Sequence, residues 1–267
     1  MYDSRMIYSA GNRHIEETES NSNGAKSFGR QRQYLKPKQK RARWKKMANL
    51  VRVTVGYEQL AEERIYDNYA WHKKAWTMFE HHHELKDRNS KREMDKGPTP
   101  FLSRYIQKSS HAVLLIVSEY SPLKPDWCGN EQWQMIEIDE SYLTQDSYYF
   151  DLYANPTKAV KKPDNNGGFT KHGRRLTLMD TPSQREWLYR KGNSHGFQLV
   201  EDIPLRIEKP VNHYFNRKGK KGLHIGVRFQ GALRVTNSCE FRDAFRRGIG
   251  TAKGFGFGLL MIKPAHF

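Results

Sequence analysis

Cysteine is scarce in this chain: only Cys128 and Cys239 occur among 267 residues. Two thiols give no disulfide framework, and a cysteine-based zinc site needs more of them. No apolar stretch approaches the roughly 18 residues that predict a membrane-spanning helix. The N-terminus also lacks the apolar core of a signal peptide. We therefore expect a cytoplasmic protein that does not span a membrane.

Acidic residues are also in short supply. The chain has 29 Asp and Glu against 46 Lys and Arg, a formal net charge of +17. Such an excess favours a polyanionic partner, either nucleic acid or an anionic membrane surface, and says nothing about the fold. Of these two we expect nucleic acid and no membrane partner. The hydrophobic share of 37% and the aromatic share of 12% are enough to build a core, which argues against global disorder.

The basic charge is densest near the start of the chain. Residues 1–46 are polar and end in the run R-Q-R-Q-Y-L-K-P-K-Q-K-R-A-R-W-K-K, which has no acidic residue. This composition predicts a basic, disordered extension. It either binds nucleic acid or contributes nothing. We expect two domains after it, over residues 47–145 and 146–267.

The first of these two regions has the pattern of one strand, a helix, a hairpin and a further strand. Val51, Val53 and Val55 alternate with polar residues, as in a half-buried strand. Asp67 or Asn68 can cap the helix that follows. We expect the strand Leu50–Val55, the helix Tyr69–His81, and the strands Phe101–Gln107, Ala112–Ser118 and Gln132–Ile138. This is the outline of a ferredoxin-like domain whose second helix is degenerate.

The second region repeats the pattern. Thr181 is placed to cap a helix with Pro182 at its first position and Gly192 past its end, and Asn237 to cap the last helix. We expect a strand over Tyr148–Tyr153, extended chain over Phe197–Ile207, a hairpin of Val211–Phe215 and Leu223–Val235, and a final strand over Phe255–Ile262. The predicted fold class is therefore α+β, with two tandem ferredoxin-like (βαββαβ, RRM-like) domains and a C-terminal glycine-rich loop.

The glycine-rich loop, residues 248–258, carries glycine at positions 248, 250, 254, 256 and 258. Its spacing fits neither the dinucleotide-binding fingerprint nor a P-loop. The run K-G-F-G-F copies the start of the RNP1 motif, but it follows a helix and closes the chain, so its position is wrong for a standard RNA-recognition module. We predict that Gly250, Lys253 and Gly254 bind RNA phosphates through this loop. The alternative is a tight turn with glycines for packing.

Three groups of basic residues complete the predicted RNA-binding surface. A-form RNA hides its base edges in a narrow major groove, so contacts to its backbone should dominate. The alternative for each group is ordinary solvated surface. The three groups are Arg217, Lys218, Lys220 and Lys221 at the hairpin tip, then Lys171, Arg174 and Arg175, and finally Arg242, Arg246 and Arg247 on the last helix. The predicted contacts outside the loop are all members of the first two groups, together with Arg247 and Lys158.

His72 is the candidate for proton transfer. On a helix, Tyr69, His72 and Trp76 are spaced at i, i+3 and i+7 and share one face. Imidazole moves protons near neutral pH, although a lone histidine on a helix is more often structural. The run 81–83 contains three adjacent histidines, which point about 100° apart and cannot converge on one metal. We predict no metal site and no cofactor.

Taken together, four motifs resemble a known family. They are G-I-G-T-A-K-G-F-G-F-G-L-L near the C-terminus, Y-x-x-H-x-x-x-W, F-D-L-Y-A-N-P-T-K and the basic hairpin. They resemble the CRISPR repeat-RNA endoribonucleases of the CasE type, in the RAMP superfamily. The resemblance covers residues 48–267. It implies two ferredoxin-like domains and metal-independent cleavage of precursor CRISPR RNA at the 3′ base of the repeat stem-loop.

The resemblance also implies a mechanism and partners. The 2′-hydroxyl beside the scissile phosphate attacks it and leaves a 2′,3′-cyclic phosphate, with His72 as general base or acid and Tyr69 assisting. The enzyme then stays on the mature crRNA with the backbone and large subunits of Cascade, and meets target DNA through the complex. A second hypothesis remains open: a non-catalytic RNA-binding or scaffold subunit with the same fold.

Overall fold

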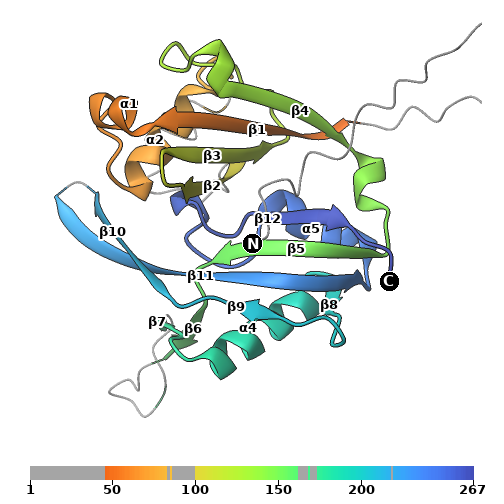
Figure 1. Ribbon diagram of the computed structural model, residues 1–267. Coiled ribbons are helices and arrows are strands. Elements are labelled where there is room, and N and C mark those ends of the chain that lie inside the picture. The colour runs from red at the N-terminus through yellow and green to blue at the C-terminus, as the bar shows by residue number, and fades with distance from the viewer. Residues whose placement is uncertain (1–45, 83–84, 86–99, 162–167, 169–172, 218) are drawn as a thin grey trace, which may run out of the picture.

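The computed structural model describes residues 46–82, 85, 100–161, 168, 173–217 and 219–267. Two antiparallel sheets lie one above the other in Figure 1, each with its own helices. The predicted basic extension lies outside the described residues, except that Lys46 begins the first strand. Among the described helices, none combines the length and the apolar character needed to cross a membrane.

The first sheet has the strand order β2-β3-β1-β4. Its strands are β1 (Lys46–Gly56), β2 (Phe101–Gln107), β3 (His111–Ser118) and β4 (Trp133–Asp139), all antiparallel to their neighbours. Helices α1 (Tyr57–Glu62) and α2 (Asn68–Thr77) lie between β1 and β2. The short 3₁₀ helix η1 (Asn130–Gln132) stands where the second helix would be. This is the ferredoxin-like order, and the prediction of a degenerate second helix is confirmed.

The alternation expected for β1 is present, since Val51, Val53 and Val55 are fully buried against the helices. The cap of α2 is Asp67, whose Oδ1 accepts from the Ala70 amide at 2.7 Å. The prediction that α2 reaches His81 is wrong, because the helix ends at Thr77. Helix α1 was not predicted. It is a six-residue helix whose N-cap, Gly56, has no capping side chain.

The second sheet has the order β10-β11-β5-β12, which is the same topology. Helix α4 (Thr181–Asn193) follows β5, and helix α5 (Ser238–Arg247) follows β11. The strands are β5 (Ser147–Ala154), β10 (Val211–Arg217), β11 (Lys220–Val235) and β12 (Leu260–Pro264), with β8 (Phe197–Leu199) and β9 (Arg206–Ile207) also paired to β11. A 3₁₀ helix, η2 (Glu140–Leu143), joins the two sheets. The predicted tandem ferredoxin-like fold is confirmed.

A separate two-stranded ribbon is formed by β6 (Thr157–Val160) and β7 (Arg174–Thr177), and β6 was not predicted. Two further expectations in this half are wrong. Helix α4 is capped by Asp180, whose carboxylate accepts from the Ser183 amide, so Thr181 is its first residue and Gly192 lies inside it. A carboxylate at a helix N-terminus also interacts favourably with the helix dipole, which explains why it takes the cap.

The last predicted strand also begins too early. Residues Lys253–Phe255 form the 3₁₀ helix η3, and β12 starts only at Leu260. Gly256 and Gly258 have φ of 85° and 87°, a left-handed conformation that a strand cannot contain. The chain therefore turns through the glycines before it becomes extended.

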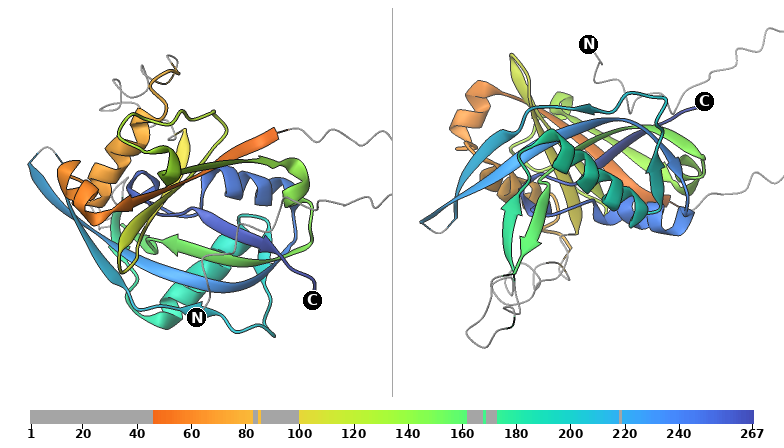
Figure 2. Two further views of the ribbon diagram at one scale, coloured as in Figure 1. Left: turned by 45° about the horizontal axis from the view of Figure 1, so that its top comes forward. Right: turned by 90° about the horizontal axis from the view of Figure 1, so that it is seen from below.

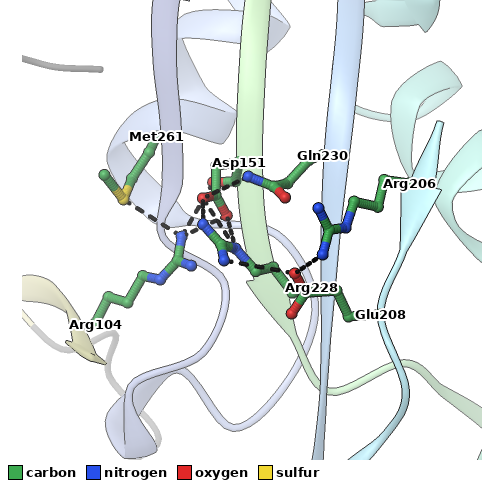
Figure 3. Close-up of polar contacts among 7 residues, drawn as sticks. All are labelled: Arg104, Asp151, Arg206, Glu208, Arg228, Gln230 and Met261. Atoms are coloured by element: carbon green, nitrogen blue, oxygen red, sulfur yellow. Dashed lines mark hydrogen bonds and ion pairs between the residues drawn. The ribbon is translucent and has the colours of Figure 1, made fainter. Parts of the chain in front are cut away.

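A shared core and a buried ion-pair network join the two sheets. Leu102, Val113 and Val117 face away from α2 and pack with residues of the second sheet and α5. Beside them, the Arg104 guanidinium donates to Asp151 on β5 at 2.8 Å, and both side chains are about 95% buried. Figure 3 shows Arg228 and Gln230 of β11 reaching the same carboxylate. Asp151 thus accepts hydrogen bonds from both sheets.

Candidate functional site

His72 is held on α2 by aromatic neighbours. Its Nε2 accepts a hydrogen bond from the Trp76 indole N–H at 3.1 Å, and the Phe101 ring centroid lies 5.7 Å from the imidazole. The side chain is half-buried. Because Nε2 is the acceptor in this bond, the neutral imidazole carries its proton on Nδ1. The bond from Trp76 thus orients the ring and favours this tautomer.

The glycine-rich loop lies directly against this imidazole. A Cβ placed on Gly254 would be 3.5 Å from Cε1 and 3.8 Å from Nε2 of His72. The Tyr69 ring faces the next residue, with its centroid 6.1 Å from that of Phe255. The structure therefore brings together the two features that the sequence presents as separate sites.

Two side chains at the start of α2 hold the glycine-rich loop and strand β10. The buried Asn68 amide donates to the Phe255 carbonyl at 2.8 Å, over a separation of 187 residues. The second carboxylate oxygen of Asp67 accepts from the Asn216 amide of β10 at 3.2 Å. The sequence suggested both residues only as helix caps. Nothing in their spacing signals these contacts, which depend on how the two sheets pack.

The turn of the loop explains part of its glycine content. The Ile249 amide donates to the Gly258 carbonyl at 2.8 Å, and the Gly258 amide to Tyr153 at 2.7 Å. A Cβ on Gly258 would lie 2.6 Å from the Ile249 oxygen, and one on Gly248 would lie 2.8 Å from the Gly258 oxygen. Packing therefore requires glycine at 248 and 258. At 254 a Cβ would meet nothing closer than His72.

Basic residues lie within the loop and next to it. The half-buried Lys253 ammonium has its pKa lowered by burial and by the nearby charges of Lys191 and Arg247. Its neighbour Arg247 is exposed at the end of α5. By contrast, Arg246 forms an ion pair with Glu119 at 3.3 Å. Of the predicted RNA-binding residues, Lys253 and Arg247 therefore share one positively charged region with Gly254.

The basic hairpin of β10 and β11 lies beside α1 and α2 in Figures 1 and 2. Its inner face packs on the loop, with the Phe215 and His224 ring centroids 4.5 Å and 4.7 Å from that of Phe255. Near its tip the predicted residues Arg217, Lys220 and Lys221 are exposed, and Lys218 lies outside the described residues. The tip therefore presents its charges next to the helix that carries His72.

The β6–β7 ribbon carries the other predicted basic residues. Lys158, Arg174 and Arg175 are exposed on these paired strands, and Lys171 lies outside the described residues. Figure 1 places the ribbon on the far side of β10 and β11 from α2. The structure thus brings these residues to each other, and Thr157 at the start of β6 meets the glycine-rich loop at Thr251, with 3.5 Å between the two hydroxyl oxygens. No cluster of three or more potential metal-binding side chains occurs within the part of the chain that the structure describes.

Fold and site together define a class: a tandem ferredoxin-like protein whose C-terminal glycine-rich loop packs on a histidine-bearing helix of the first domain. Residues 48–264 match the family described as CRISPR associated protein, and the chain belongs to that family. The resemblance inferred from the motifs is therefore confirmed at the level of the family.

Similar proteins have been characterised. The chain is 36% identical over 121 residues to the CRISPR system Cascade subunit CasE of Escherichia coli. It is 29% identical over 124 residues to the CRISPR-associated endoribonuclease Cse3 of Thermus thermophilus. Each match covers 43% of this chain, and the matches span 57% and 54% of those two relatives. The chain thus matches little more than half the length of either curated relative.

The fold resemblance extends further than the sequence identity. A structure of CRISPR endoribonuclease Cse3 bound to a 19-nucleotide RNA superposes with a TM-score of 0.62 at 21% identity. The superposition covers 81% of this chain and 99% of that one. This likeness supports the tandem ferredoxin-like fold.

Proposed function

We propose that this protein is an endoribonuclease that cuts precursor CRISPR RNA at the 3′ base of the repeat stem-loop. The observation that carries the proposal is the proximity of Gly254 to the His72 imidazole, whose Cε1 lies 3.5 Å from where a Cβ on residue 254 would stand. A loop that can approach RNA closely and a group that can move a proton occupy the same place. The membership of a CRISPR associated family, and relatives named CasE and endoribonuclease Cse3, support the choice of substrate.

The reaction needs a proton acceptor, a proton donor and a fixed geometry. The RNA 2′-hydroxyl attacks the adjacent phosphorus and loses its proton, while the bond from phosphorus to the 5′-oxygen breaks and that oxygen gains a proton. The products are a 2′,3′-cyclic phosphate and a 5′-hydroxyl. We assign one of the two proton transfers to His72, with Tyr69 on the same helix face assisting.

Because the RNA supplies its own nucleophile, the reaction does not require a metal-activated water. We therefore propose that cleavage is metal-independent. Lys253, next to Gly254, and Lys73, whose ammonium lies 5.4 Å from the centroid of the Tyr69 ring, are candidates to stabilise the charge that builds on the phosphate.

RNA binding is assigned to the charges around this site. The loop and the β10–β11 hairpin would hold the RNA near His72, and the β6–β7 ribbon would contact a more distant part of the stem. We further propose that the protein stays on the mature crRNA with the other Cascade subunits, that it meets target DNA through that complex, and that its two domains divide at residues 145 and 146.

The competing proposal is a non-catalytic RNA-binding subunit with the same fold. The tautomer-fixing bond from Trp76 to His72 favours the enzyme, because a binding protein needs no oriented imidazole. The two proposals differ in what His72→Ala does. Loss of the imidazole should slow cleavage by about 10²–10⁴-fold if it transfers a proton. It should leave RNA affinity nearly unchanged.

The test is to incubate the protein in EDTA with a transcript carrying two repeats from the CRISPR array of its own genome. Wild type should cut it, His81→Ala should match wild type as an exposed histidine just past the same helix, and His72→Ala should not. A substrate with 2′-deoxyribose at the cleavage site should stay intact. Equal cutting by His72→Ala would remove the catalytic assignment, and inhibition by EDTA would remove the metal-independent mechanism.

A further inference from the structure

Three segments meet at the proposed site, and each contacts the other two. Helix α2 holds the glycine-rich loop through the bond from Asn68 to Phe255, and it holds the β10–β11 hairpin through the bond from the Asn216 amide to Asp67. The hairpin and the loop pack through Phe215 and Phe255, whose centroids are 4.5 Å apart. A closed triangle of contacts fixes all three segments.

Asp67 uses both of its carboxylate oxygens, and they serve different segments. Oδ1 caps α2 through the Ala70 amide at 2.7 Å, and Oδ2 reaches the hairpin at 3.2 Å. Capping alone does not require a carboxylate. Helix α5 is capped in this chain by the single amide oxygen of Asn237, and Asn and Asp are about equally good caps. The second oxygen is therefore the feature to explain.

We propose that Asp67 is a positioning residue that couples the RNA-binding hairpin to the helix carrying His72, with Asn68 doing the same for the glycine-rich loop. This inference rests on the proposed function. RNA held by the hairpin would then be placed in register with the imidazole, and a misplacement of about 1 Å at a reacting group can cost a large factor in rate. The hairpin supplies affinity, and Asp67 supplies alignment.

If Asp67 couples the hairpin to the helix, its loss should lower the cleavage rate while leaving the affinity for RNA nearly unchanged. Asp67→Asn keeps an oxygen for the cap but turns an N–H group toward the Asn216 amide, which is also a donor. We expect the maximal single-turnover cleavage rate to fall about 5–20-fold, as expected for lost alignment. Affinity for the uncleavable 2′-deoxy repeat RNA should change less than about threefold, because the basic residues of the hairpin remain.

The matched control is Asp180→Asn, which makes the same change at the cap of α4, where the carboxylate accepts from the Ser183 amide of its own helix turn and, among the described residues, has Lys158 as a nearby charge. It should match wild type in rate and affinity. Asp67→Ser, which keeps one capping oxygen, should behave as Asp67→Asn. Asn68→Ala should lower the rate at least as much, since its bond is more deeply buried.

The measurement is single-turnover cleavage at increasing enzyme concentration, together with thermal unfolding of each variant. A lower maximal rate at unchanged half-saturation and melting temperature supports the coupling. Equal rates for Asp67→Asn and wild type overturn it and leave the proposed function standing. A drop in melting temperature shared by both Asp67 variants would show a purely structural contact and would also overturn it. Failure of wild type to cut repeat RNA would overturn the proposed function and this inference together.

Discussion

The two halves of the molecule are joined at Asp151 and again at Phe255. The contact at Asp151 is made by charged groups, and the contact at Phe255 is made by neutral ones. At Asp151 a buried carboxylate receives two guanidinium groups, one from each sheet (Figure 3). At Phe255 the contact consists of a neutral amide bond, aromatic rings and a glycine lying on the His72 imidazole. A buried charge is costly without its partner, whereas neutral contacts can be altered with less loss. The first contact should therefore govern stability, and the second should govern the geometry of the site.

The largest expected effect is at the charged contact. Asp151→Asn removes the charge that Arg104 and Arg228 require, and breaking a buried ion pair costs about 3–5 kcal/mol. The control is Glu208→Gln, since Glu208 is one-third exposed and pairs at 3.3 Å with Arg206 and, at the rim of the same network, at 3.5 Å with Arg228, which keeps Asp151 in this variant. Partly exposed pairs contribute about 1 kcal/mol or less. Denaturant unfolding measures the loss of unfolding free energy in each variant. Equal losses in Asp151→Asn and Glu208→Gln would contradict the prediction that the buried pair matters more.

The ion pairs of Asp151 should also make the unfolding free energy depend on pH. Burial alone would raise the pKa of the Asp151 carboxyl, but Arg104 and Arg228 outweigh burial and hold that pKa below its ordinary value. A lowered folded-state pKa means that the stabilisation is complete above the unfolded value, near about 4, and is lost as the pH falls through the folded value. The unfolding free energy of wild type should therefore approach that of Asp151→Asn below about pH 4. If the difference in unfolding free energy between wild type and Asp151→Asn stayed constant down to about pH 2, the predicted direction of the pH dependence would be wrong.

Two glycines of the same loop, Gly258 and Gly254, should differ in the same way: one matters for stability and the other for the site. Gly258→Ala places a Cβ 2.6 Å from the Ile249 oxygen at a φ of 87°, and such strain costs about 1–3 kcal/mol. For Gly254→Ala the nearest atoms to the new Cβ are those of His72, at an ordinary 3.5 Å or more, so the unfolding free energy should stay within about 0.5 kcal/mol. The new methyl group would nevertheless cover the imidazole, and we expect RNA cleavage to slow about tenfold or more.

Thermal unfolding and single-turnover cleavage, measured for both Gly258→Ala and Gly254→Ala, test these two predictions. The expected result is a less stable Gly258→Ala and a stable but slow Gly254→Ala. If Gly254→Ala cleaved as fast as wild type, the substrate would not approach His72 past this glycine.

Local patterns were enough to predict most of the fold. The alternation at Val51, Val53 and Val55, and the caps at Asp67 and Asn237, act over a few residues and hold wherever the element sits. Competing local signals explain the errors at α4, where Asp180 and Thr181 are adjacent possible caps. The site was harder to predict from the sequence, because Gly254 and His72 come close together only through the packing of the two sheets. That packing depends on Arg104 and Asp151, which have no periodic signal.

The smallest expected effect concerns the orientation of the imidazole. Trp76→Phe removes the N–H that Nε2 of His72 accepts, and a typical hydrogen bond contributes about 1 kcal/mol. We expect cleavage to slow only a fewfold. Trp71→Phe is the matched control, since Trp71 lies on the same helix and its ring packs 5.1 Å from Tyr105 instead of on His72.

Nitrogen NMR of the histidine ring separates an effect on the tautomer from an effect on packing. In wild type the neutral ring should show its proton on Nδ1, because Trp76 occupies Nε2. Trp76→Phe should shift the ring toward a mixture of both tautomers, and Trp71→Phe should not. An unchanged tautomer in Trp76→Phe would mean that contacts with the glycine-rich loop, and not the bond from Trp76, orient the ring. The neutral contact between the sheets would then fix the chemistry of His72 as well as its position.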